Sequence, residues 1–179
     1  MLVMEEGAII DTFNVAINLD KITMKANSSI GRSNWITGFP TKTNSKHFAH
    51  QSDRRSELII GEFSAITKKH HIDCTNLITI GAFATIAGYQ SQLLTHSIDI
   101  YENHQNSKPI YIGDYTFIGT NAVILGGAKL PSNSVLGAKS LLNKSFEEEY
   151  MLYAGVPAKP TSKISTDAKY FKRPIGFVI

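Results

Sequence analysis

The sequence predicts an all-β protein folded as a parallel β-helix, and the spacing of its aliphatic residues carries that prediction. Between residues 112 and 142 an aliphatic side chain recurs at every sixth position. Neither an α-helix, at about 3.6 residues per turn, nor a flat strand, with a period of about two, gives that spacing over so long a run. A fixed short repeat is typical of a solenoid whose rungs each point one apolar side chain inward. The repeat consists of Ile112, Ile118, Ile124, Leu130, Leu136 and Leu142.

The same period occurs earlier in the chain. It runs through Ile60, Ile66, Ile72 and Ile78, and it restarts two residues later as Ile80 and Ile86. Glycine follows the aliphatic position in several rungs, for example at Gly113, Gly119 and Gly137, as expected where the backbone turns sharply. Residues 1–36 keep apolar residues of the right kind at a looser spacing, which is typical of the terminal repeats of a solenoid.

Two segments break the repeat and are expected to protrude as loops. Residues 37–57 and 97–109 are polar and show no period. Long segments of this kind in a compact domain are usually functional. We therefore expect one β-helix domain over residues 1–160, interrupted by these two insertions. Residues 161–179 form a short C-terminal tail, either a short helix or an arm packed against a neighbour.

Length and composition limit the function classes. The chain has 179 residues, a net charge of +3 and a single cysteine, Cys74. The charge is too small and diffuse to indicate nucleic-acid binding, and no apolar run approaches the ~18 residues of a membrane span. A lone cysteine and an acidic start without a leader pattern favour a cytoplasmic protein.

Histidine is the first candidate for chemistry, because its ordinary pKa near ~6.5 lets it accept a proton at neutral pH. Of the six histidines, His96 stands where a regular coil ends and the 97–109 loop begins, so a rigid scaffold would position it. If Ile72 stacks on Gln92, then Asn76 stacks on His96 and could orient it or bind an acceptor. Asn76 could equally be a corner residue of the coil.

A polar cluster on the preceding coil is the second candidate. Asp73 lies next to His70 and His71. A carboxylate at this place, with His71 beside it, could bind a sugar hydroxyl. Asp73 could also cap its own backbone at a corner.

Three segments resemble the hexapeptide-repeat acyltransferases, and among them the sugar O-acetyltransferases related to the maltose, galactoside and colanic-acid enzymes. These segments are IGDYTFIGTNAVIL (112–125), KLPSNSVLGAKSLLNK (129–144) and YAGVPAKP (153–160), with the His96 loop upstream. The resemblance covers roughly residues 58–160. It implies a left-handed β-helix, acetyl-CoA as co-substrate, no metal, and a homotrimer whose pantetheine groove lies between two adjacent chains.

The resemblance also implies roles for individual residues. His96 would be the general base that takes the proton from the acceptor hydroxyl, which then attacks the thioester directly. Asp73, His71 and Asn76 would bind the acceptor. The acetyl-CoA contacts implied are Ala87, Phe117, Gly119, Thr120, Ala138, Lys139, Lys144 and Lys159. Lys139 departs from the family, which has glycine there.

The leading hypothesis is an acetyl-CoA-dependent O-acetyltransferase for a sugar, most simply a precursor of a surface polysaccharide. An amino sugar or an antibiotic could be the acceptor instead, and Trp35, Phe39 and Phe48 could shape its pocket. A zinc enzyme of the carbonic-anhydrase type is a further alternative, but it needs three imidazoles and position 101 is Tyr101. The last alternative is a non-catalytic trimeric scaffold.

Overall fold

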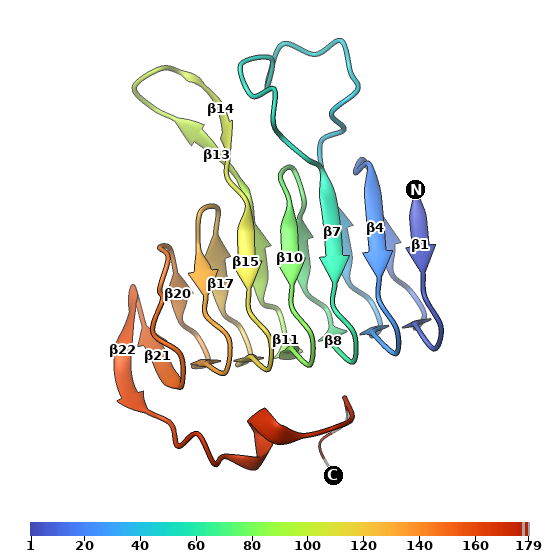
Figure 1. Ribbon diagram of the computed structural model, residues 1–179. Helices are drawn as coiled ribbons and strands as arrows, with labels where there is room; N and C mark the ends of the chain where they lie inside the picture. The colour runs from blue at the N-terminus through green and yellow to red at the C-terminus, as the bar shows by residue number, and fades with distance from the viewer. Residues whose placement is uncertain (177, 179) are drawn as a thin grey trace.

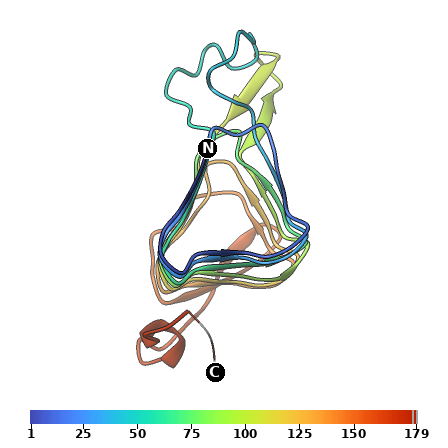
Figure 2. The same ribbon diagram turned by 90° about the vertical axis from the view of Figure 1, so that its right-hand side faces the viewer.

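The chain is a three-sided β-helix whose coils become smaller toward the C-terminal end (Figures 1 and 2). The computed structural model describes residues 1–176 and residue 178. Each full coil contributes one strand to each of three parallel sheets, and the coil is left-handed (Figure 1). The parallel β-helix and the left hand predicted above are both confirmed.

The strands fall into three stacked sheets and one hairpin. The first sheet holds β1 (Leu2–Met4), β4 (Lys21–Met24), β7 (Glu57–Ile60), β10 (Ile78–Ile80), β15 (Ile110–Ile112) and β18 (Lys129–Leu130). The second holds β2 (Ile9–Ile10), β5 (Ser29–Ile30), β8 (Ala65–Lys68), β11 (Thr85–Tyr89), β16 (Phe117–Ile118), β19 (Val135–Leu136), β21 (Met151–Gly155) and β22 (Ala158–Lys163). The third holds β3 (Val15–Ala16), β6 (Trp35–Thr37), β9 (His71–Asp73), β12 (Gln92–Leu94), β17 (Val123–Leu125) and β20 (Leu141–Leu142). The hairpin is β13 (His96–Asp99) with β14 (His104–Ser107).

The aliphatic repeat forms the core, because each sheet points one row of side chains inward. In the second sheet this row is Ile30, Ile66, Ile86, Ile118, Leu136 and Tyr153, in register from coil to coil. Each of these side chains is at most 1% exposed. The loose spacing of residues 1–36 also forms two coils, whose strands pair in register with the regular ones.

The glycines after the aliphatic positions serve close packing, so the expectation that they make the sharp turns is wrong. A Cβ on Gly113 would lie 2.4 Å from the backbone nitrogen of Ser132 on the next coil. The turns are made two residues later by non-glycine residues in the left-handed region, such as Tyr115 at φ 53° and Lys139 at φ 55°. A six-residue rung therefore needs a small residue where backbones stack and a left-handed residue where the chain bends.

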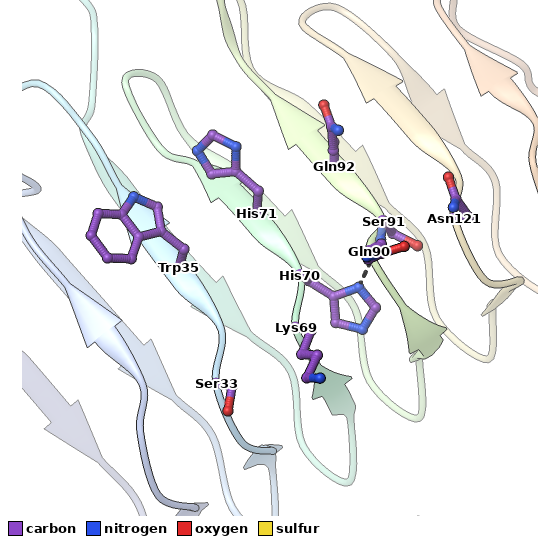
Figure 3. Close-up of a pocket in the computed structure, with 9 residues that line it drawn as sticks. All are labelled: Ser33, Trp35, Lys69, His70, His71, Gln90, Ser91, Gln92 and Asn121. Carbon is purple, nitrogen blue, oxygen red and sulfur yellow. Dashed lines mark hydrogen bonds between the residues drawn. The ribbon is translucent and has the colours of Figure 1, made fainter.

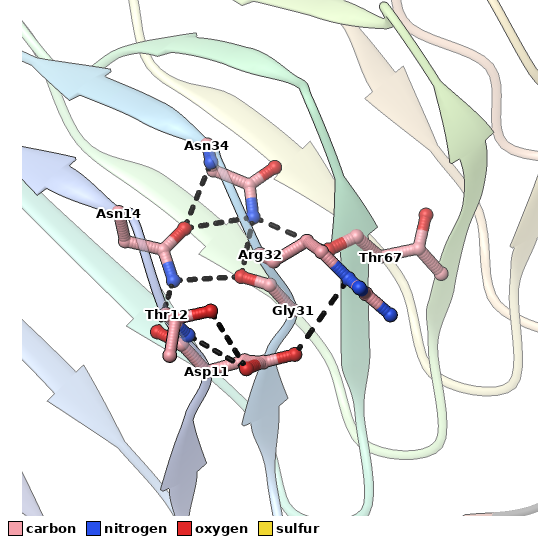
Figure 4. Close-up of polar contacts among 7 residues, drawn as sticks. All are labelled: Asp11, Thr12, Asn14, Gly31, Arg32, Asn34 and Thr67. Atoms are coloured by element: carbon pink, nitrogen blue, oxygen red, sulfur yellow. Dashed lines mark hydrogen bonds and ion pairs between the residues drawn. The ribbon is translucent and has the colours of Figure 1, made fainter.

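One corner of the prism carries a ladder of partly or fully buried asparagine side chains (Figure 4). Asn14 Nδ2 donates to the Gly31 carbonyl at 2.7 Å, and Asn34 Nδ2 donates to the same carbonyl at 2.9 Å. Asn34 Oδ1 accepts from the His70 backbone N–H at 2.9 Å on the following coil. These amides satisfy corner carbonyls that no strand can pair, which is what buried backbone groups require.

Two insertions leave the same corner of the prism, between the third and first sheets (Figure 2). Residues 38–56 connect β6 to β7, and residues 95–109 connect β12 to β15. The second insertion is a hairpin in which His96 pairs with Ser107, so it is more regular than expected from its sequence. Between the two insertions lies the tight corner that connects β9 to β10.

The C-terminal tail folds back along a different corner, between the first and second sheets (Figure 2). It contains a short 3-10 helix at Lys169–Lys172, and Phe177 and Ile179 lie outside the described residues. Tyr170 donates its hydroxyl to the Thr116 carbonyl at 2.9 Å, and Arg173 donates to the Tyr170 carbonyl at 2.7 Å. The tail is therefore both a short helix and an arm, packed on its own chain.

Candidate active site

A cavity lies at the base of the two insertions and brings three of the predicted site residues together. Its volume is about 310 Å³, and we call it the loop cavity. His96 lines it from the hairpin, and His71 and Asp73 line it from β9. The first insertion closes it with Phe39 and Phe48. The remaining lining residues are Thr37, Gly38, Thr75 and Leu94.

His96 is exposed to solvent in this cavity and held from two sides. Its Nε2 is hydrogen-bonded to Oε1 of Gln105 across the hairpin. Its ring meets Phe48 edge to face, with ring centroids 5.6 Å apart. Because an amide oxygen only accepts hydrogen bonds, this contact places the proton on Nε2 and leaves Nδ1 as the free base of the neutral ring.

Asp73 caps its own corner, as one of its two predicted roles requires, and it also lies in the wall of the loop cavity. Its Oδ1 accepts from the Thr75 backbone N–H at 2.9 Å and from the Thr75 hydroxyl at 2.7 Å, so it caps the corner after β9. It also lines the loop cavity. A carboxylate fixed in this way is preorganised for a donor in the cavity.

Asn76 does not line the loop cavity, and the stacking that linked it to His96 is wrong. Ile72 pairs with Leu93, not with Gln92, so the register differs by one residue. Asn76 Nδ2 donates to the Ser107 hydroxyl at 3.2 Å. That hydroxyl in turn donates to Gln51 Oε1 at 2.7 Å. Asn76 thus ties the coil to both insertions.

Arg54 is a buried cation that sequence reasoning missed. It donates to the Thr75 carbonyl at 2.6 Å and to the Pro40 carbonyl at 3.0 Å, and its guanidinium lies 4.6 Å from the Phe48 ring centroid. Burial lowers the pKa of Arg54, and the negative charge of Asp20 partly offsets that effect. The first insertion has no period, so nothing in the sequence distinguishes Arg54 from the exposed Arg55 beside it.

The predicted acetyl-CoA residues follow a different part of the prism. Ala87, Phe117, Gly119, Thr120, Ala138 and Lys139 lie on the second sheet or at its corner with the third, and Lys159 lies on β22. Lys144 follows β20, with its Nζ 5.1 Å from the Phe146 ring centroid. Phe117 packs edge to face on Tyr170 of the tail at 5.9 Å.

The row of small residues at this corner differs from expectation by one position. Thr120 and Ala138 follow Ile118 and Leu136, which are paired. On the coil before, Gly88 rather than Ala87 lies against Thr120, since a Cβ on Gly88 would be 2.5 Å from its hydroxyl oxygen. Ile86 pairs with Ile118, and Gly88 follows Ile86 by two residues just as Thr120 follows Ile118. The row Gly88, Thr120, Ala138 leaves the corner free of bulky side chains.

Within residues 1–176 and 178, no three His, Cys, Asp or Glu side chains form a group that could hold a metal ion. Among the same residues, no helix has the length and apolar character needed to cross a membrane.

Comparison with known proteins relates this coil to acetyltransferases. A putative acetyltransferase of Staphylococcus aureus (strain Mu50 / ATCC 700699) is 33% identical over 76 residues, covering 41% of this chain and 38% of that protein. A chloramphenicol acetyltransferase of Klebsiella aerogenes is 24% identical over 155 residues, covering 79% of this chain and 70% of that protein. The chain thus spans about two fifths of the length of the Staphylococcus aureus relative. No protein-family model matches.

Solved structures show the same fold. A hexapeptide-repeat acetyltransferase of Vibrio cholerae, complexed with acetyl-CoA, gives a TM-score of 0.63 at 22% identity over 89% of this chain and 72% of its own. The N-acyltransferase AntD of Bacillus cereus, with dTDP-4-amino-4,6-dideoxyglucose and coenzyme A, gives 0.72 at 15% identity over 92% and 83%. The fold is the hexapeptide-repeat left-handed β-helix.

Proposed function

We propose that the protein is an acetyl-CoA-dependent O-acetyltransferase that acts on a hydroxyl of a sugar, most simply a precursor of a surface polysaccharide. The observation that carries this proposal is the loop cavity, which is lined by one histidine with a free Nδ1 and by a fixed carboxylate on a hexapeptide-repeat coil. The similarity to acetyltransferases supports the choice of acyl donor. The enzyme would be cytoplasmic.

In this mechanism His96 acts as the general base. Its Nδ1 takes the proton of the acceptor hydroxyl as the oxygen bonds to the thioester carbonyl carbon. The tetrahedral intermediate then expels the CoA thiolate, and the imidazolium returns the proton to that sulfur. No acyl-enzyme is needed. Asp73 and His71 would orient the acceptor through its other hydroxyls, and a positioned base of this kind contributes about 10²–10⁴-fold to the rate.

The acyl donor would lie along the corner marked by Gly88, Thr120 and Ala138. Residues without long side chains fit a pantetheine arm, whose path a bulky group would block. Lys139, Lys144 and Lys159 are exposed and could meet the phosphates. His96 and this row occupy different corners of one chain, so we propose a homotrimer in which one chain supplies the histidine and its neighbour the row.

A second acceptor class has its own support. AntD was solved with a nucleotide-linked amino sugar, and the relative from Klebsiella aerogenes is a chloramphenicol acetyltransferase. An amino sugar or an antibiotic alcohol would use the same base. The zinc enzyme and the silent scaffold have no feature of the loop cavity in their favour.

Two measurements test the proposal. Calorimetry with acetyl-CoA alone should show micromolar binding at one site per chain. Release of the CoA thiol should then identify the acceptor among sugars, amino sugars and chloramphenicol. If acetyl-CoA does not bind at high micromolar concentration, the acyltransferase assignment is wrong.

The residue assignment predicts the effect of His96→Ala. The variant should lower kcat by about 10²–10⁴-fold and leave acetyl-CoA affinity nearly unchanged, because only the base is lost. His47→Ala is the matched control, since His47 lies on the first insertion outside the loop cavity. Unchanged turnover in His96→Ala would remove His96 as the base.

A further inference from the structure

A second cavity lies beside the loop cavity on the outer face of the third sheet (Figure 3). Its volume is about 450 Å³, and we call it the sheet cavity. Its outward side chains come from three neighbouring strands: Trp35 from β6, His71 from β9 and Gln92 from β12. Trp35 pairs with His71, and His71 with Gln92, so the three side chains stand in one row. Adjacent members are about 4.8 Å apart.

The bottom of the sheet cavity is rigid and uncharged. His70 is 1% exposed, and burial lowers the pKa of His70 to about 4, so its ring is neutral at physiological pH. Its Nδ1 accepts from the Ser91 backbone N–H at 3.1 Å, and its Nε2 bonds the Thr67 hydroxyl at 2.9 Å. His70 therefore has no ring nitrogen left for a ligand, and the outward groups of the cavity are the row above it and, toward the second sheet, Lys69, Gln90 and Asn121.

The chemistry of that row fits a sugar ring. Trp35 is 49% exposed, although burying so large an apolar surface would be favourable. Beside it stand an imidazole and an amide, which both donate and accept hydrogen bonds as vicinal hydroxyls do. No carboxylate lines the sheet cavity among the described residues. An aromatic plane flanked by an imidazole and an amide suits a ring with one apolar face and a hydroxylated edge.

The two cavities are continuous along the strands. Residues two apart on a strand share a face and lie about 6.6 Å apart. On each of the three strands, one residue lines the sheet cavity and the residue two positions later lines the loop cavity. The pairs are Trp35 and Thr37, His71 and Asp73, and Gln92 and Leu94. His71 lines both cavities.

We propose that the sheet cavity is a saccharide subsite that holds the ring next to the one acetylated, with Trp35 as its stacking platform. The acceptor is then an oligosaccharide of at least two rings, rather than a monosaccharide or a compact antibiotic. This inference rests on the proposed function of the loop cavity, because that cavity holds the reacting ring.

The test uses Trp35 as its own probe, because it is the one tryptophan of the chain. Intrinsic fluorescence is titrated, without acetyl-CoA, with four series of one to six rings: malto-, cello-, N-acetylchito- and α2,8-linked sialyl oligosaccharides. We expect one series to shift the emission saturably, with affinity rising from one ring to two or three. No change with any series overturns the proposal. Iodide that fails to quench Trp35 in the free protein also overturns it, since the face would then be covered.

Kinetics of two variants separate this inference from the proposed function. Trp35→Ala should lower kcat/KM for the trisaccharide of the active series by roughly 3- to 10-fold and leave the monosaccharide unaffected. Trp35→Phe should recover most of the loss, and Val15→Ala, in the same outward row, should behave as wild type. Equal loss on both acceptors overturns the subsite. If the enzyme releases CoA thiol with a monosaccharide but longer acceptors give no increase in kcat/KM, the proposed function holds and the saccharide subsite is wrong.

Discussion

His70 is a polar residue that stabilises the coil and does not line the loop cavity. It is the buried member among the histidines, and its two ring nitrogens bond the Ser91 N–H and the Thr67 hydroxyl. Burial favours the neutral ring, which lowers its pKa to about 4. In the unfolded chain the same ring titrates near ~6.5. The folded state therefore binds a proton less readily than the unfolded state.

This difference makes stability depend on pH through His70. Its contribution is fully present above pH ~6.5 and is lost as pH falls toward 4, because protons then favour the unfolded chain. Between pH 7.4 and pH 5 the loss should be about 2 kcal/mol from this residue. Urea unfolding at fixed protein concentration measures it.

The adjacent histidine supplies the control for that measurement. His70→Gln should flatten the pH dependence between 7.4 and 5, whatever its effect at neutral pH, whereas His71→Gln should keep it. His71 is exposed on the next position of the coil. A wild-type slope in His70→Gln would show that another group carries the pH dependence.

The two insertions act as one element because direct contacts join them. Gln51 Nε2 donates to the Ser107 carbonyl at 2.9 Å and to Asn106 Oδ1 at 3.1 Å. The rings of His50 and His104 lie 4.2 Å apart. Arg54 anchors the first insertion to the corner after β9. We call these contacts of Gln51, His50 and Arg54 the clamp. The shape of the loop cavity depends on the clamp, because Phe48, which contacts His96, lies in the segment that these contacts hold.

Removing the anchor should open the clamp without unfolding the coil. Arg54→Met leaves buried carbonyls unsatisfied, at a cost of about 1–3 kcal/mol each. We expect proteolysis within residues 38–56 to accelerate at least tenfold and kcat/KM to fall. Arg55→Met is the control: Arg55 makes only a surface ion pair with Glu57 at 2.8 Å, which is worth about 0–1 kcal/mol. Equal proteolysis of both variants would contradict an anchoring role.

The β-helix and part of the loop cavity could both be predicted from the sequence, because both depend on regular spacing along the chain. The six-residue period fixes which residues point inward, and the period of two within a strand places His71 and Asp73 on one face. His96 was found because it stands where a regular coil ends and an insertion begins. Gln105, Gln51 and Arg54 were missed because their partners lie on the other insertion or across an irregular turn. Such contacts are set by tertiary packing, which no local pattern encodes.

The proposed active site needs two chains, because His96 and the small-residue row lie at different corners of one chain. His96 follows the third sheet at its corner with the first, whereas Thr120 and Ala138 stand where the second sheet meets the third. One chain alone holds these features on different edges. The proposed trimer brings the edge of one chain to the other edge of its neighbour, so each site would be shared.

Shared sites predict complementation between two inactive variants. His96→Ala lacks the base, and Ala138→Trp should block the pantetheine path and raise the KM for acetyl-CoA. Trimers assembled from an equal mixture should recover about a quarter of wild-type activity, since a site then has both parts intact with a probability of about one in four. Dissociation, mixing and thiol release measure this. No recovery in mixed trimers would place the base and the groove in the same chain.

The spacing between the insertions has a consequence for how such a protein changes its substrate range. The loops depart after β6 and β12, with the β9 corner between them, so they stand two coils or about 10 Å apart. That width cannot vary continuously, because the stack grows only by whole coils. A repeat duplicated between β6 and β12 would widen the opening by one fixed increment and add another outward side chain beside Trp35. Substrate length in this architecture would therefore evolve in discrete steps, each the thickness of a single strand.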